Sequence, residues 1–325
     1  MGPRTLVIWG AAALVSTVAA VVVTLDARRD VTEAARLDEP VFEALRQSPE
    51  TAAAVTIVHG GDELRVARAE ARWVVPAAHG YAADASALRD LLTALADLRW
   101  AAPRTALAER YARLEVDDPG PESAATRVTV TADGGAILAD AIIGKRSRAI
   151  SGDERGTYLR LPEAERAWLA KGTVEVATAA LDWLDTELPS LARDELKVVV
   201  VEPAAGAGFT AGRTTPEEDM TLVDQLPLDR TADAAEIRRL ASAFASLRFE
   251  EVRPAGEVDW PEVTTTITGT GFGGETVALQ LATLAEGERW VRFADVADWV
   301  YKLPTFQIDR LDKRIGDLVS RPEPS

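Results

Sequence analysis

One stretch of this chain occurs twice, and that repeat constrains the fold more than any other feature. Residues 83–100 read ADASALRDLLTALADLRW, and residues 232–249 read ADAAEIRRLASAFASLRF. At this constant offset half of the positions are identical, and most of the others are conservative replacements. An internal repeat of this length indicates one structural unit made twice. We therefore expect two similar units in tandem.

The repeat extends beyond this stretch. YLRL at 158–161 matches WVRF at 290–293, and LDWL at 181–184 matches IDRL at 308–311. Each copy predicts two or three strands, a helix, a hairpin, a further strand and a final short helix. The predicted units comprise residues 51–190 and 191–318, followed by a tail at 319–325.

The repeated stretch itself predicts a helix in each unit. In the first copy Asp84 is placed to cap the helix, and in the second Asp233 caps it with Glu236 as a capping-box partner. A short helix is also expected at 164–169, ending at Gly172. The apolar stripe of the first helix has helical spacing: Leu88, Leu91, Leu92, Leu95 and Leu98.

The N-terminus carries an apolar segment. Residues 6–25, which Leu6 and Leu25 bound, contain no charged side chain and are long enough for a transmembrane helix. An uncleaved anchor is preferred to a cleaved signal peptide, because a cut after 18–20 would leave the apolar VVVTL at the new N-terminus. The expected fold class is therefore α+β: a transmembrane helix, then two tandem repeats of antiparallel sheet with packed helices.

The flanks of that segment bear on location. A short tail at 1–5 precedes it, and a charged tether at 26–50 follows it. Arg28 and Arg29 give a weak positive-charge signal after the segment. The N-terminal tail has only five residues and a large domain follows the apolar segment, which still favours a signal anchor whose N-terminus lies in the cytoplasm. The predicted location is the bacterial inner membrane, single-pass, with the bulk of the chain periplasmic.

Composition excludes several classes of function. The net charge of −16 disfavours nucleic acid and anionic lipid headgroups as partners of the surface. The chain has no cysteine, so disulfides, thiol catalysis and thiolate metal sites are excluded. The hydrophobic share of 47% is ordinary for a globular protein.

Glycine-rich motifs do not predict nucleotide binding. The cluster at 269–274 precedes a strand pattern, whereas a dinucleotide fingerprint needs a helix there, so a hairpin turn is preferred. Gly144, Lys145, Arg146 and Ser147 resemble the end of a P-loop, but the upstream glycine is missing because position 139 is Ala.

Catalytic residues are not predicted either. His59 and His79 are the only histidines, and both fall in turn or loop positions. Asp182 and Asp309 recur in the two units and are interpreted as helix N-caps. Arg160 and Arg292 also recur, and they either pair with those aspartates or line a common face. No catalytic, cofactor-binding or metal-ligating residue is assigned, no cofactor is expected, and the residues of any binding site stay unknown.

The tryptophans have two interpretations. They form either part of the apolar cores or a stacking surface for a ligand, and core packing is preferred because several fall at repeat-equivalent apolar positions. The residues concerned are Trp73, Trp100, Trp168, Trp183, Trp290 and Trp299.

Two further stretches carry a family resemblance. Together with the apolar N-terminus and YLRL, LASAFASLRFEEVRPA at 240–255 and ALDWLDTEL at 180–188 resemble the bacterial family catalogued as domain of unknown function 4340. The resemblance covers the chain from about residue 40 to its end. It implies a single-pass envelope protein associated with ABC-type transporters of the kind linked to gliding motility, and it implies no catalytic residue.

Three functions follow as hypotheses. The preferred one is a non-enzymatic accessory or interaction subunit of an ABC-type transport system, anchored through residues 6–25. The alternative is an extracytoplasmic module that binds a glycan, lipid or peptide in a cleft between the repeats, lined by tryptophans and the repeated arginines. The third is a hydrolase with paired carboxylates, for which no pair stands out.

Overall fold

The computed structural model describes residues 36–148, 155–224, 230–245, 247–262, 264–284 and 287–320. It divides into two compact units. The first comprises the chain up to Val74 together with Ala85–Trp183, and the second comprises Val75–Asp84 together with Leu184–Ser325. Residues 6–25, where the transmembrane helix is expected, lie outside the described ranges. Within those ranges, no helix has the length and apolar character needed to cross a membrane.

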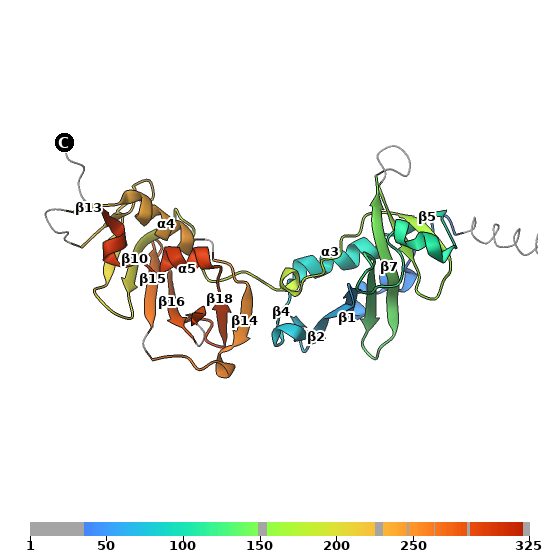
Figure 1. Ribbon diagram of the computed structural model, residues 1–325, viewed down its shortest axis with the longest axis horizontal. Helices are drawn as coiled ribbons and strands as arrows, with labels where there is room; N and C mark the ends of the chain where they lie inside the picture. Colours follow the sequence, from blue (N-terminus) through green and yellow to red (C-terminus); the bar gives the residue numbers. More distant parts are fainter. Residues whose placement is uncertain are drawn as a thin grey trace, which may run out of the picture. The chain divides into compact units, whose positions relative to one another are not determined.

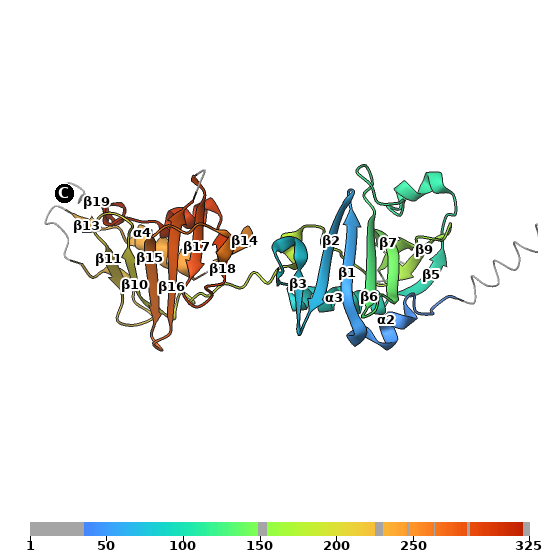
Figure 2. The same cartoon turned by 90° about the horizontal axis from the view of Figure 1, so that it is seen from below.

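The first unit is built on one antiparallel sheet. Its strands lie in the order β3-β2-β1-β6-β7-β8-β9-β5, as Figure 2 shows from below. The strands are β1 (Ala52–His59), β2 (Asp62–Ala69), β3 (Arg72–Val75), β5 (Arg99–Pro103), β6 (Thr126–Ala132), β7 (Ile137–Ser147), β8 (Gly156–Arg160) and β9 (Ala167–Lys171). Helices α2 (Glu43–Gln47) and α3 (Ala85–Ala96) contact each other, and α2 also contacts β7.

The second unit repeats that order. Its sheet runs β12-β11-β10-β15-β16-β17-β18-β14, again antiparallel throughout. The strands are β10 (Leu196–Glu202), β11 (Phe209–Gly212), β12 (Thr221–Leu222), β14 (Glu251–Pro254), β15 (Thr265–Gly271), β16 (Thr276–Thr283), β17 (Arg289–Phe293) and β18 (Trp299–Lys302). A small second sheet pairs β13 (Thr231–Ala232) with β19 (Val319–Ser320). The sheets of the two units therefore share one strand order.

The repeated stretch forms a helix followed by a strand in each unit. In α3, Leu88, Leu91 and Leu95 are buried, as their helical spacing predicts. In α4 (Ala234–Phe244), the carboxylate of Asp233 accepts hydrogen bonds from the amides of Ala235 and Glu236. This confirms Asp233 as the N-cap.

The predicted fold class is wrong. The described residues are mostly antiparallel sheet, with 19 strands in three sheets and few helices, and they include no apolar N-terminal helix. The strong helical periodicity of two stretches led to an α+β expectation. Short edge strands such as β5 and β14 carry little periodicity, so the sheet is larger than the pattern indicates.

One helix of the sequence prediction is a strand. Residues 164–169 read AERAWL, and alanine, glutamate, arginine and leucine all favour a helix locally. Instead, β9 (Ala167–Lys171) pairs on one side with β8 and on the other with β5. Trp168 and Leu169 are both buried there. Burial on both sides of the strand therefore decides against the local helix propensity.

A short segment from the first half of the chain belongs to the second unit. Val75–Asp84, which contains β4 (Tyr81–Ala82), brings Tyr81 against the rings of Phe249, Trp299 and Tyr301. The ring centroids are 5.5, 4.9 and 6.1 Å from that of Tyr81, and all three pairs are edge-to-face. The second core is therefore completed by residues that precede α3 in sequence.

Candidate functional site

A close approach of two backbone segments defines the first candidate site. At Gly144 in β7, a Cβ atom would lie within 3.0 Å of the carbonyl oxygens of Leu114 and Glu115 and of a methyl group of Val116. The amide of Lys145 donates to the Leu114 carbonyl oxygen at 3.1 Å. The register between β7 and β8 also shifts between Ile143 and Arg146, as at a β-bulge. Such bulges redirect side chains.

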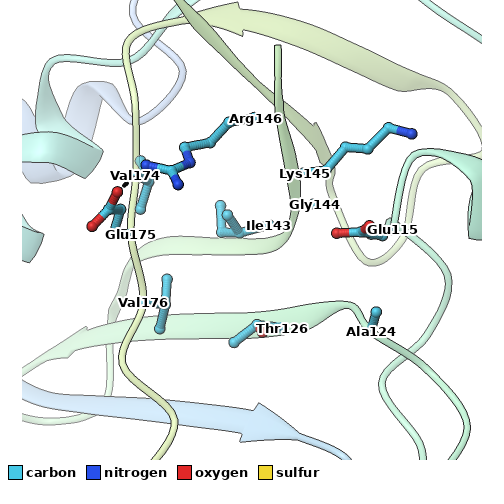
Figure 3. A pocket seen from close by; sticks show the side chains of 10 residues that line it. All are labelled: Glu115, Ala124, Thr126, Ile143, Gly144, Lys145, Arg146, Val174, Glu175 and Val176. Atoms are coloured by element: carbon cyan, nitrogen blue, oxygen red, sulfur yellow. Dashed lines mark hydrogen bonds and ion pairs between the residues drawn. The ribbon is translucent and has the colours of Figure 1, made fainter. Parts of the chain in front are cut away.

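A polar hollow of about 370 Å³ lies beside this bulge, and we call it the Gly144 hollow. Figure 3 shows its wall, which combines the end of β7 with the start of β6 and the segment after β9. The lining residues are Glu115, Ala124, Thr126, Ile143, Gly144, Lys145, Arg146, Val174, Glu175 and Val176.

Charges of both signs line the Gly144 hollow. Arg146 forms an ion pair with Glu175 on one side of it. Lys145 and Glu115 lie on the other side in Figure 3. Glu115 has the left-handed backbone conformation, with φ of 60°. A hollow with this mixture suits a ligand or protein surface that offers both charges, and it has no nucleophile set beside a base.

Arg160 holds the segment that forms one wall. Its Nε donates to the Val116 carbonyl oxygen at 2.8 Å, and its Nη2 lies 2.5 Å from a carboxylate oxygen of Asp118. The guanidinium group also lies 4.7 Å from the ring centroid of Tyr111. Because Arg160 is buried and fully engaged, its role is structural. Its ion-pair partner is Asp118 and not Asp182, the partner in one of the two alternatives left open above.

A second hollow, of about 430 Å³, lies beside α3, and we call it the α3 groove. One wall is the face of α3, and the other is the chain that follows β9. It shares Glu175 and Val176 with the Gly144 hollow, so the two hollows meet on one surface of the first unit. Its lining residues are Ala87, Asp90, Leu91, Ala94, Thr173, Glu175, Val176, Ala177 and Trp183.

The two histidines have separate structural contacts. His59 ends β1, and its Nδ1 lies 3.0 Å from the Thr126 hydroxyl. His79 has φ of 56° and its Nδ1 lies 3.2 Å from a carboxylate oxygen of Glu257. Across the parts of the chain that the structure describes, no three His, Asp or Glu side chains are grouped so as to hold a metal ion.

The glycine motifs lie in β-structure. Gly269 and Gly271 belong to β15, and the chain turns through 272–275 into β16. This confirms the hairpin interpretation. Gly144, Lys145, Arg146 and Ser147 all belong to β7, so the P-loop resemblance has no strand-to-helix turn behind it.

The repeated aspartates are not N-caps, contrary to the interpretation from sequence. Asp182 lies inside the short 3-10 helix η4 (Ala180–Trp183). Asp309 lies inside α5 (Thr305–Leu311), whose N-cap is Pro304, and it forms an ion pair with Arg289. Each helix begins several residues earlier than the sequence pattern indicated, at Ala180 and at Thr305, so each aspartate lies within its helix. Arg292 instead donates to the side-chain oxygen of Gln280 at 2.7 Å.

Four tryptophans are core residues, as preferred above. Trp100 and Trp168 are buried with ring centroids 5.0 Å apart, and the indole of Trp183 donates to the Ala177 carbonyl oxygen. Trp290 is buried in the second unit. Because these side chains are committed to separate cores, they do not supply the stacking surface that the ligand-cleft hypothesis needs.

Two tyrosines and one ion pair of the second unit have shifted pKa values. Burial raises the pKa of Tyr81 and of Tyr301. A hydrogen bond from Lys302 lowers the pKa of Glu288 and in turn raises that of Lys302. These shifts have structural causes: burial of the two phenols and the ion pair between Lys302 and Glu288.

The structure is thus a protein of two antiparallel-sheet units, and two hollows with charged lining lie on its first unit. The family model described as Domain of unknown function (DUF4340) matches residues 73–266, which is more than half of the chain. The protein therefore belongs to this family, as the resemblance indicated. No curated protein and no solved structure matches the chain.

Proposed function

We propose that this protein is a non-enzymatic accessory subunit of an ABC-type transport system in the bacterial envelope. Residues 6–25 hold it at the inner membrane, and the two units lie on the periplasmic side. Its work is to bind a protein of the transport complex. The observation that carries the proposal is the surface on which the Gly144 hollow and the α3 groove meet.

The character of that surface supports protein binding. It joins small apolar side chains, such as Ala87 and Ala94, to ionic groups of both signs, such as Lys145 and Glu175. Protein interfaces carry polar and apolar groups together, much as other protein surfaces do, so this lining is compatible with protein binding. The strongly engaged groups elsewhere, Arg160 and the tyrosines Tyr81 and Tyr301, serve the cores.

The membrane part of the proposal rests on the sequence. A span of twenty residues without a charge matches the thickness of a bilayer core. An arginine at the centre of such a segment costs about 3 kcal/mol on the insertion scale. Val15→Arg is therefore expected to move the full chain from the carbonate-washed membrane pellet to the soluble fraction, whereas Thr5→Arg, outside the segment, is expected to leave it in the pellet.

Affinity purification tests the partner. The tagged full chain is recovered from gently solubilised membranes, and we expect a transporter permease or ATPase to accompany it. Val15→Arg serves as the control, because it removes the protein from the membrane without touching either hollow. Recovery of the wild-type chain with no permease, ATPase or envelope protein would sink the proposal.

A further inference from the structure

The repeated helix of the second unit covers one face of its sheet. A Cβ atom added at Gly269 in β15 would meet the ring of Phe244 in α4, so α4 packs on the face to which Gly269 points. Helix α5 contacts α4 (Figure 1). Because side chains alternate along a strand, Thr266, Thr268 and Thr270 point to the opposite face, which Figure 2 shows in front of α4.

Uncharged side chains make up the centre of this opposite face. The strand register places Val200 between Thr210 and Thr268, and it places Ala278 on the far side of Thr268. Val223, just beyond β12, continues the row beside Thr210, and it is 66% exposed. We call these partly or fully exposed side chains the threonine face: Val200, Thr210, Val223, Thr266, Thr268 and Ala278.

The first unit carries an ion pair at the matching place. In the register that the two sheets share, Arg127 holds the position of Thr266. Asp140 likewise holds the position of Ala278. Arg127 donates to both carboxylate oxygens of Asp140, at 2.9 and 2.7 Å. The duplicated sheet therefore has a charged version of this face in the first unit and an uncharged version in the second.

An uncharged face suits contact with a second copy of this chain. In a contact between two copies related by a two-fold axis, the central side chains meet their own counterparts, so charged groups there would repel one another. The chain carries a net charge of −16, which makes most encounters between copies unfavourable. Threonine hydroxyls both donate and accept hydrogen bonds, so they can pair with their own counterparts. Two sheets pack face to face in this way in β-sandwiches.

We propose that two copies of this protein associate through the threonine face, with the second unit of one copy packed against the second unit of the other. The matching face of the first unit does not form such a contact, because the Arg127–Asp140 ion pair would have to lose its water there. This inference goes beyond the proposed function and does not depend on it.

Exchange of the two versions of the face tests the contact. The double variant Thr266→Arg, Ala278→Asp gives the second unit the ion pair of the first, and the reciprocal variant Arg127→Thr, Asp140→Ala removes that pair from the first unit. Two full-length copies with different tags, both carrying the same variant, are co-expressed, and one is purified from gently solubilised membranes. We expect the wild-type chain and the reciprocal variant to recover the second copy, and the double variant to recover about tenfold less of it.

Crosslinking tests the contact without adding charge to the face. Because the chain has no cysteine, one introduced thiol reports on one position. Thr268→Cys, treated with a short bismaleimide in native membranes, is expected to give a covalent dimer of the full chain. Thr129→Cys lies at the matching position of the first unit and is expected to give none.

Several results would overturn the proposal. It falls if the wild-type copies do not co-purify, if the double variant recovers the second copy as well as the reciprocal variant does, or if Thr268→Cys attaches only to a different protein. Thermal unfolding shows whether the double variant is folded, and the crosslink decides alone if it is not. A folded double variant that no longer self-associates but still recovers a transport protein leaves the proposed function standing.

Discussion

Arg160 and Arg292 show how one repeated residue acquires two roles. They hold matching register positions, opposite Ile142 in one sheet and Gln280 in the other. Arg160 is 5% exposed and makes hydrogen bonds to three carbonyl oxygens besides its ion pair with Asp118. Arg292 donates to one side chain and lies over the ring of Trp260. The sequence repeat alone does not distinguish these environments, because the partners of Arg160 lie in loops at 116–118 and 162–164, whereas Gln280 lies in a strand.

Replacing each arginine with lysine is expected to separate the two roles. A lysine at 160 cannot satisfy a carbonyl set arranged for a guanidinium group, so Arg160→Lys should lower the free energy of unfolding by about 3 kcal/mol. Arg292→Lys should cost less than about 1 kcal/mol. Urea denaturation of the full chain in detergent measures both, and equal losses would contradict the assignment of Arg160 as a buried anchor.

At the scale of elements, the bulge of β7 is the feature that forms the first hollow. Gly144 permits the segment 114–116 to lie against the strand, and Lys145 hydrogen-bonds it there. Lys145 and Arg146, the two cationic residues that follow Gly144, then line the hollow near the end of β7. Glycine followed by two basic residues within a strand pattern is the only sequence signal of this site, and it also fits an ordinary turn.

Gly144→Ala is expected to destabilise the first unit by about 2 kcal/mol or more, because the added methyl group meets backbone atoms that cannot move aside easily. Gly256→Ala is the matched control, since an added Cβ there meets nothing within 4 Å. Thermal unfolding of the two variants gives the comparison. A Gly144→Ala protein as stable as the control would show that segment 114–116 is loosely held.

Sequence patterns predicted local features better than tertiary ones. The Asp233 cap, the buried leucines of α3 and the turn before β16 each depend on residues close in sequence. The strand at β9 and the placement of Tyr81 depend on partners far away. Glu175 belongs to an irregular segment with no motif, so its role in both hollows was not predictable.

At the scale of the whole molecule, the chain passes between the two units three times. It crosses after Val74, after Asp84 and after Trp183. Ala83 pairs with Leu184, and the amide of Asp185 donates to the Ala82 carbonyl oxygen at 3.0 Å. The second unit thus consists of two segments that lie far apart in the sequence.

Removing the earlier piece is expected to leave the second core open. A fragment of residues 184–325 lacks Tyr81, whose loss alone corresponds to an aromatic-to-alanine change of about 3–5 kcal/mol. We expect it to bind a hydrophobic dye and to unfold at lower urea than the same fragment with 75–84 fused ahead of Leu184 through a short glycine linker. Equal stability of the two proteins would show that the segment is dispensable.

Alkaline pH offers a second test of the same core. The pKa values of Tyr81 and Tyr301 are both raised, chiefly by burial, so the folded chain retains protons that the unfolded chain loses above about pH 10. Stability is therefore complete below that pH and falls as the pH rises, by up to about 1.4 kcal/mol per unit for each tyrosine.

The double variant Tyr81→Phe, Tyr301→Phe removes both titrating groups and keeps most of the ring packing. Its free energy of unfolding between pH 9 and 11.5 should fall less steeply than that of the wild-type chain. If the two pH profiles run parallel, ionisation of these phenols does not limit the second core.

The position of Tyr81 also sets an order of events during synthesis. Tyr301 follows it by 220 residues. At about 5 to 20 residues per second, the ribosome needs roughly 10 to 40 s to make the ring against which Tyr81 will pack. Helix α3 and strands β5 to β9 of the first sheet are synthesised in that interval. Because Tyr81 is synthesised long before the rings that it packs against, the core of the second unit is the last part of the nascent chain to be completed. A chaperone that binds this protein during synthesis is therefore needed longest at the second unit.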